Sequence, residues 1–164
     1  MVESSPGSLS GKPVIDSEVV MTQLVMPSDT NALDTVFGGV IMSWIDICGA
    51  ISAQRHSCRT VVTASLDELN FIAPVYRGWV VNLKARVNFV SRTSMEVGVR
   101  VDAENPRTNT KFHTASAYMT FVALNDQGKP VAVPSLILQT DADRRRHADG
   151  QGRRDLRIAR RNQK

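Results

Sequence analysis

The chain has 164 residues, 42% of them hydrophobic, and a formal net charge of +4. This length supports one hydrophobic core and leaves no room for a second domain of comparable size. Residues 1–16 lack the basic and apolar regions of a signal peptide, and the longest apolar run, residues 40–53, is interrupted by Ser43, Asp46 and Gly49. We therefore expect a cytoplasmic protein with no membrane-inserted segment.

The basic side chains are concentrated at the C-terminal end. Residues 141–164 carry nine Arg or Lys side chains against four Asp side chains, whereas the preceding residues are nearly neutral. Such a tail could contact nucleic acid, could contact the phosphates of a nucleotide-like ligand, or could form a solvated surface helix. We divide the chain into a lead-in (1–16), one domain (17–140) and a basic, partly helical tail (141–164).

The expected elements follow one another in a simple order. Residues 1–16 are rich in Ser, Gly and Pro, which favours a flexible lead-in, and residues 18–25 predict a first strand. Residues 39–56 have helical length and are apolar nearly all round, which predicts one buried helix. Segments rich in β-branched and aromatic side chains then predict four long strands, at residues 60–71, 79–90, 94–104 and 111–125.

These elements define the expected fold class. The strand at residues 79–90 alternates, and its apolar face is expected to contain Val81, Leu83, Ala85, Val87 and Phe89. Short links favour antiparallel pairing, because parallel pairing would need helical crossovers that the sequence lacks. The chain is therefore expected to be α+β, with an antiparallel sheet wrapped around one helix. A homodimer would cover the sheet area and edges that a single helix leaves open.

Asp46 is the only charged side chain within residues 40–53. An ionised carboxylate in an apolar setting is costly unless it is paired or hydrogen-bonded, so Asp46 is a candidate functional residue. Helical spacing places Gly39, Ser43 and Asp46 on one face. Seven residues span roughly 10 Å of helix axis, so the carboxylate could face a group bound near Gly39.

Gly38 and Gly39 stand at the start of this helix. The first turn of a helix has unpaired N–H groups and a positive dipole end. These amides could stabilise the negative charge that develops on a carbonyl oxygen during acyl transfer. The alternative is that the two glycines serve only a tight turn into the helix.

Asn31 and Asp46 belong to a longer motif, N-x(5)-F-G-G-x(3)-S-W-I-D, and a weaker motif, S-x-x-S-M-E, follows at residues 91–96. With VVTASLDELNF and TASAYMTFVALNDQGKPVAVP, these segments resemble the hotdog-fold acyl-CoA thioesterases of the brain-type and bacterial short-chain acyl-CoA hydrolase group. The resemblance covers residues 20–134. It implies a hotdog fold with one long central helix, and hydrolysis of acyl-CoA to free fatty acid and coenzyme A. It implies no cofactor, because coenzyme A enters only as part of the substrate and product.

The resemblance also assigns roles to residues. Asp46 would act as the general base on water, or as a nucleophile, and Asn31 would orient the water or the carbonyl. The two residues would come from different subunits of a homodimer, within a trimer of dimers. Without the resemblance, the preferred interpretation of Asn31 is an Asx-turn or a cap residue in its loop, which is rich in Pro and Asp.

Two further groups are expected to bind the substrate. Thr63 and Ser65 alternate onto one face of their strand, and the resemblance places them near the thioester or the pantetheine arm. The turn expected to contact the nucleotide end of coenzyme A contains Ser91, Arg92, Thr93 and Ser94, where a guanidinium among hydroxyls suits a phosphate. Ordinary strand hydroxyls and a plain polar hairpin are the respective alternatives.

Other chemistries have less support. His56, His113 and His147 form no metal-binding pattern, so we expect no metal, and no G-x-S-x-G motif is present. Phe37 replaces the His that is common before the two glycines in relatives, and the acyl chain length is not predicted. The competing hypothesis is a non-catalytic acyl-CoA-binding regulator whose basic tail contacts nucleic acid, although we do not expect nucleic acid as a partner.

Overall fold

The computed structural model describes residues 9–162. Two helices and five long strands make up most of this part of the chain, with two short strands and two 3-10 turns beside them. The elements are β1 (Lys12–Pro13), η1 (Val14–Ser17), β2 (Val19–Leu24), η2 (Pro27–Asp29), α1 (Gly38–Ser57), β3 (Thr60–Phe71), β4 (Val80–Val90), β5 (Ser94–Asn105), β6 (Thr110–Leu124), β7 (Leu136–Ile137) and α2 (Asp141–Arg161). The predicted first helix and the five predicted strands are all present, with ends that differ by one residue at most.

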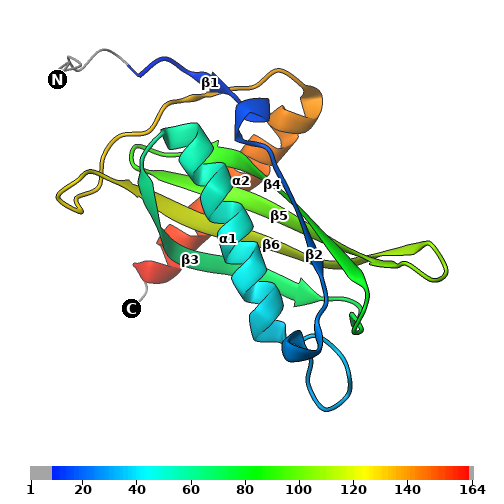
Figure 1. The fold of residues 1–164 in the computed structure, drawn as a ribbon. Coiled ribbons are helices and arrows are strands. Elements are labelled where there is room, and N and C mark those ends of the chain that lie inside the picture. The colour runs from blue at the N-terminus through cyan, green and yellow to red at the C-terminus, as the bar shows by residue number, and fades with distance from the viewer. Residues whose placement is uncertain (1–8, 163–164) are drawn as a thin grey trace, which may run out of the picture.

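The five long strands form one antiparallel sheet in the order β2-β4-β5-β6-β3. The sheet curves around α1, which lies along one of its faces (Figure 1). Val81, Leu83 and Val87 of β4 are fully buried on this face, as are the partner side chains of β5 and β6. The predicted α+β class and the hotdog arrangement, a sheet wrapped around one long helix, are therefore confirmed.

One residue predicted for this core, Phe89, lies on the opposite face of the sheet. A register shift between Val87 and Phe89 breaks the alternation of β4, and Phe89 pairs with Glu96. Its ring lies 5.1 Å from that of His147 on α2, so Phe89 faces away from α1. The extra residue of a β-bulge turns every later side chain to the other face.

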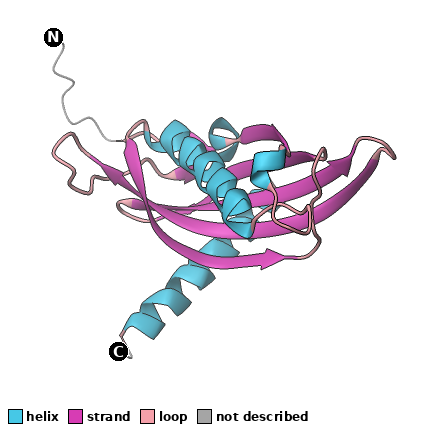
Figure 2. Cartoon of the chain, turned by 60° about the horizontal axis from the view of Figure 1, so that its bottom comes forward, coloured by secondary structure: helices cyan, strands magenta, loops and turns pink. Residues whose placement is uncertain are grey.

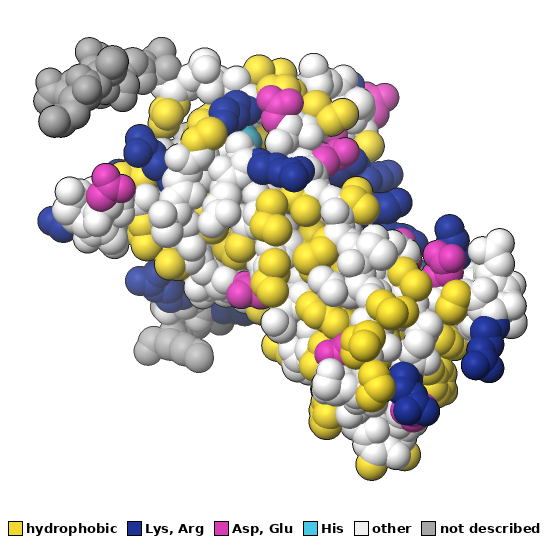
Figure 3. All heavy atoms as spheres, viewed as in Figure 1, with side chains coloured by type: hydrophobic (Ala, Val, Ile, Leu, Met, Phe, Trp, Pro, Cys, Tyr) yellow, Lys and Arg dark blue, Asp and Glu magenta, His cyan; other side chains and the backbone are white. Residues whose placement is uncertain are grey.

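Helix α1 is covered by the sheet on one side only. Ile41, Ile45 and Cys48 are buried, and Gly49 lets the helix lie close to β6, since a Cβ there would stand 3.0 Å from Cε2 of Phe121. On the opposite side Met42 and Ile47 are exposed, and apolar side chains gather over this face (Figure 3). The prediction that the helix is buried all round is therefore wrong for the single chain, because one sheet can cover only one side of a helix.

Helix α2 lies on the other face of the sheet (Figure 2). The side chain of Thr140 accepts a hydrogen bond from the backbone N–H of Asp143 at 3.0 Å, and Asp143 caps the helix in return. Gly150 lets α2 approach the strands, because a Cβ there would stand 2.8 Å from Cβ of Phe89. The basic tail thus contacts the strands between Asp143 and Arg157, while its last residues are exposed. Neither helix of residues 9–162 is long and apolar enough to cross a membrane.

The N-terminal lead-in is described only from residue 9 onward, so the prediction of flexibility for residues 1–8 lies outside the described part. Lys12 and Pro13 pair in parallel with β7, and Val14 is buried. Residues 12–16 are thus part of the ordered domain, unlike the expected flexible segment. The partner strand lies more than 100 residues away in the sequence, so no local pattern indicates the pairing.

Candidate active site

Asp46 is half-buried on α1, and the hydroxyl of Thr63 on β3 donates to its Oδ1 at 2.6 Å. Within residues 9–162 no cation pairs with this carboxylate and no hydrogen bond reaches its Oδ2. One oxygen is therefore held in place while the other is available to accept a proton. Sequence reasoning named both residues but not their contact, because the two are joined only by the packing of α1 against β3.

Thr63 and Ser65 do not share a face, so that prediction is wrong. The register of β3 against β6 shifts between these two residues, with Thr63 opposite Phe121 and Ser65 opposite Thr120. Thr63 reaches Asp46 on the α1 side, whereas Ser65 hydrogen-bonds Asp67, which pairs with Arg157 of α2. A β-bulge at this point reverses the side chains that follow it.

The N-terminal end of α1 offers free backbone donors. No side chain caps the helix, and the first backbone bonds run from Val40 and Ile41 to the carbonyl of Phe37, at 3.0 and 3.3 Å. The amides of Gly38 and Gly39 have no acceptor among the described residues. A Cβ on Gly39 would meet no atom within 4 Å, so the space beside Gly39 is open. This geometry suits a carbonyl oxygen that gains negative charge.

An apolar cavity of about 320 Å³ lies beside this helix end. It is lined by Thr35, Val36, Gly38, Ile41, Phe71, Ile72, Ala73, Pro74 and Val75. Most of these residues come from the end of β3 and the segment after it, which the sequence analysis did not assign to the site. The run Phe71–Val75 is conspicuously apolar for a loop, which is the signal that could have indicated it.

Asn31 forms the Asx-turn that was the alternative for this residue. Its Oδ1 accepts from the backbone N–H of Leu33 at 2.9 Å and from the backbone N–H and hydroxyl of Thr35, at 3.3 and 3.1 Å. The carbonyl oxygen is thus committed to the loop, while the amide Nδ2 has no acceptor among residues 9–162. Asn31 can therefore act only as a donor. No hydrogen bond joins it to Asp46 within the described chain.

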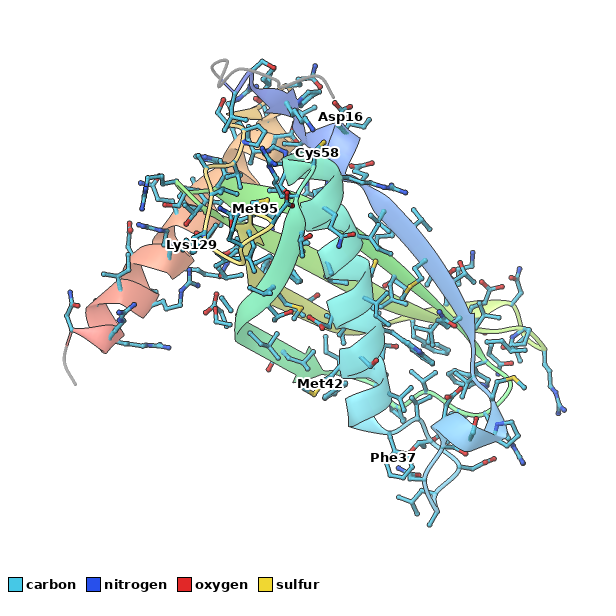
Figure 4. All side chains as sticks on the ribbon, turned by 60° about the vertical axis from the view of Figure 1, so that its left-hand side comes forward. Asp16, Phe37, Met42, Cys58, Met95 and Lys129 are labelled. Carbon is cyan, nitrogen blue, oxygen red and sulfur yellow. The ribbon has the colours of Figure 1, made fainter. Side chains whose placement is uncertain are left out.

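The turn at residues 91–94 lies at the opposite end of α1 from Gly39. Ser94 pairs with Val122 near the start of β3, which directly follows α1, whereas Gly38 lies beside Phe71 at the far end of β3. Figure 4 shows the same separation, with Phe37 at one end of the helix and Cys58 and Met95 toward the other. Arg92 is exposed, and its backbone carbonyl accepts from Val133 at 3.0 Å.

Other side chains near Asp46 that could take part in catalysis are not activated. Burial raises the pKa of the Cys48 thiol to about 11, although Arg55 opposes the shift, so this thiol is not a nucleophile at neutral pH. His56 is buried further along α1, where its Nε2 lies 2.8 Å from the carbonyl oxygen of Pro134. Among residues 9–162 no three His, Cys, Asp or Glu side chains are grouped so that they could hold a metal ion. Asp46 is therefore the candidate reactive group of this helix.

Comparison with known proteins gives this geometry a context. The family model of the thioesterase superfamily matches residues 33–110. The uncharacterized acyl-CoA thioester hydrolase YkhA of Bacillus subtilis is 43% identical over 128 residues, which are 78% of this chain and 74% of YkhA. A hexameric acyl-CoA thioesterase in its apo form is 37% identical, with a TM-score of 0.89 over 92% of this chain and 97% of that one. The Staphylococcus aureus acyl-CoA hydrolase, solved with butyryl-coenzyme A, is 36% identical, with a TM-score of 0.85 over 93% of both chains.

Some relatives are longer than this chain. The chain spans only 36% of the cytosolic acyl coenzyme A thioester hydrolase of Rattus norvegicus, to which it is 39% identical over 139 residues. For YkhA and the two structures, by contrast, the similarity covers most of both chains. The resemblance noted in the sequence is therefore confirmed, and the chain belongs to the thioesterase superfamily, among its hotdog-fold acyl-CoA thioesterases.

Proposed function

We propose that this chain hydrolyses acyl-CoA to a free acid and coenzyme A, with Asp46 as the general base. The observation that carries the proposal is the 2.6 Å hydrogen bond from Thr63 to one oxygen of Asp46. The bond fixes the carboxylate and leaves its second oxygen free to take a proton from water. Direct attack by Asp46 on the thioester, which would form an anhydride, is the second mechanism that this geometry allows.

The thioester carbonyl is proposed to lie against the free amides at the start of α1. The Gly39 amide would donate to the oxygen as negative charge develops, and the Nδ2 of Asn31 supplies a further donor that its own loop does not use. The apolar cavity beside Gly38 suits the acyl chain. Arg92, in the exposed turn with Ser91, Thr93 and Ser94, is proposed to contact the nucleotide end of coenzyme A.

The site is proposed to form between two subunits. Asp46 lies eight residues beyond Gly38, or roughly 12 Å along the axis, so it is distant from Asn31 of its own chain. The exposed side of α1, with Met42 and Ile47, is the apolar surface that a second copy would cover. The hexameric state of a structurally similar thioesterase supports a trimer of such dimers. The expected cytoplasmic location stays part of this proposal.

The regulator hypothesis has less support from the structure. Arg153 pairs with Glu96 at 2.7 Å, and Arg157 pairs with Asp67. Two of the arginines that would face nucleic acid are therefore engaged with acids of the sheet. Thiol release from acyl-CoA, as opposed to binding without turnover, distinguishes the two functions.

The direct test is thiol release from acyl-CoAs of increasing chain length by the full chain and by Asp46→Asn. This near-isosteric change removes the base and is expected to lower kcat by about 10²- to 10⁴-fold. Asp126→Asn, which removes an exposed acid that forms no ion pair among the described residues, is the matched control and should keep full activity. A folded Asp46→Asn variant with wild-type kcat would exclude the proposed role.

A further inference from the structure

A second cavity lies on the face of the sheet opposite α1. It has a volume of about 390 Å³ and is enclosed between α2 and strands β2, β4, β5 and β6. Five cationic side chains line it, namely Lys84, Arg86, Arg100, Arg146 and Arg153. The acidic lining consists of Glu18 and Asp149. The sheet thus separates this cavity from Asp46. The proposed hydrolysis does not account for the cavity.

Three of the five cations already have acidic partners. Arg86 pairs with Glu18 at 2.7 Å and with Asp143 at 3.2 Å. Arg100 pairs with Asp102 at 2.9 Å, and Arg153 pairs with Glu96 at 2.7 Å. Lys84 and Arg146 form no ion pair within residues 9–162. Lys84 and Arg146 are therefore the two cations of the cavity without an ion-pair partner, and the lining acid Asp149 likewise forms no ion pair within residues 9–162.

Arg146 is the anomalous member. Its Nη1 is buried and has no hydrogen-bond acceptor among the described residues. Burial lowers the pKa of Arg146, and the neighbouring Arg86 and Arg145 lower it further, while Asp143 and Glu18 oppose the effect. A buried guanidinium nitrogen without an acceptor is costly, and Arg146 would lose that cost if its guanidinium turned toward an anion bound in the cavity, because Nη1 itself has almost no accessible surface.

We propose that the cavity between α2 and the outer face of the sheet binds a small phosphate-bearing anion, held by Arg146 and Lys84. A guanidinium fork matches phosphate oxygens, and the lining residue Tyr118 offers a hydroxyl donor as well. The volume is that of a small-molecule pocket, with the strands as its floor and α2 as one wall, which favours a small ligand over a macromolecule. The bound anion would join α2 to β4 and hold the helix on the sheet.

The phosphate could come from two sources, a free phosphorylated metabolite or a coenzyme A molecule whose thioester end is bound by another subunit. The first probe is pyrophosphate, titrated calorimetrically into the full chain. Arg146→Met keeps the length of the side chain but removes the charge, and it should weaken pyrophosphate binding by roughly tenfold or more. Lys84→Gln should also weaken it. Arg160→Met, which removes an exposed arginine at the far end of α2, should leave the affinity unchanged.

A second measurement uses thermal unfolding. Pyrophosphate should raise the Tm of the wild type and leave that of Arg146→Met unchanged, because only a ligand that binds the folded state stabilises it. In phosphate-free buffer Arg146→Met should be at least as stable as the wild type, since it removes the unsatisfied guanidinium. If Arg146→Met does not fold, Lys84→Gln carries the binding test alone.

The Asp46→Asn variant separates this inference from the proposed hydrolysis, and it should bind pyrophosphate as tightly as the wild type. Displacement of pyrophosphate by coenzyme A would support the site and name coenzyme A as the source of the phosphate. Independent binding of the two would support a free phosphorylated ligand. Absence of pyrophosphate binding by the wild type at millimolar concentration, or equal affinity in Arg146→Met, would overturn the proposal.

Discussion

The acidic side chains that are buried or half-buried on the two faces of the sheet differ in their partners. On the α1 face, Asp46 is held by one threonine hydroxyl and has no cationic partner within residues 9–162. On the α2 face, Glu96 and Asp143 are buried and each pairs with an arginine. Unpaired charge costs folding free energy, so it is expected where chemistry needs it, whereas paired charge can hold a helix in place. The difference supports the proposal that the α1 face is the reactive one.

The largest expected effect tests whether the α1 face is completed by a second chain. Asp46→Asn and Asn31→Ala should each be nearly inactive alone. If each site combines Asp46 of one subunit with Asn31 of another, random mixing of the two variants rebuilds about a quarter of the sites. Thiol release after the variants are refolded together measures the recovery. No recovery in oligomers that native mass spectrometry shows to be mixed would contradict a shared site.

The second prediction breaks the pairing on the α2 face. Arg153→Met leaves the carboxylate of Glu96, which is 3% exposed, buried without its partner and should lower the free energy of unfolding by about 3 kcal/mol. The variant also loses the guanidinium stacked 3.7 Å above the ring of Tyr118. Urea denaturation measures the loss, with Arg160→Met as the exposed control. A change below that of the control would mean that this pair does not hold α2.

The third prediction concerns the support of Asp46. Thr63→Val removes the hydroxyl that holds the carboxylate and should lower kcat by about tenfold, with little change in stability, because Thr63 is exposed. Thr63→Ser retains the hydroxyl and should keep most of the activity. Steady-state kinetics together with urea denaturation measures both properties. Equal loss in the two variants would point to the methyl group instead of the hydrogen bond.

The smallest expected effect is a difference between the two faces of the sheet in how pH changes the free energy of unfolding. On the α1 side, burial lowers the pKa of His56 below 6.5, although the carbonyl of Pro134 opposes this. The unfolded chain then binds the proton more readily, so stability falls as pH decreases below 6.5, by at most about 1.4 kcal/mol per pH unit. His56→Gln should remove this slope.

The α2 face should respond in a more acidic range. Burial alone would raise the pKa of Asp143, but hydrogen bonds from Thr140 and Gln139 and the charge of Arg86 bring it below 3.8. Its contribution is complete above that pH and is lost as the pH falls through the lowered value. Urea denaturation across pH separates the two windows. A His56→Gln variant with the wild-type slope near pH 6 would contradict the assignment.

Prediction from the sequence succeeded where side-chain patterns are local. The ends of the β-branched strands and of the apolar helix were predicted to within one residue, because strand and helix periodicity depends on neighbouring positions. It failed at Phe89 and Ser65, since each follows a β-bulge that reverses the faces. A bulge depends on how two strands pair, so alternation along one strand does not reveal it.

The candidate site shows the same division. Asp46 and Gly39 could be named from the sequence because a lone acid and two glycines are unusual in an apolar helix. The apolar cavity beside Gly38 could not, because its walls come from α1, β3 and the following loop. The cationic cavity between α2 and the sheet could not be predicted either, because the basic tail and the strands that face it are far apart in the chain.

By itself, the sequence determined the order and type of the elements, the family and the acid that the central helix presents, all of which depend on short-range patterns. Only the tertiary structure decided that Thr63 holds Asp46 and that Nη1 of Arg146 is buried without an acceptor among the described residues. These facts arise where distant segments pack. Burial and hydrogen bonding are properties of that packing, and no residue carries them in its own identity.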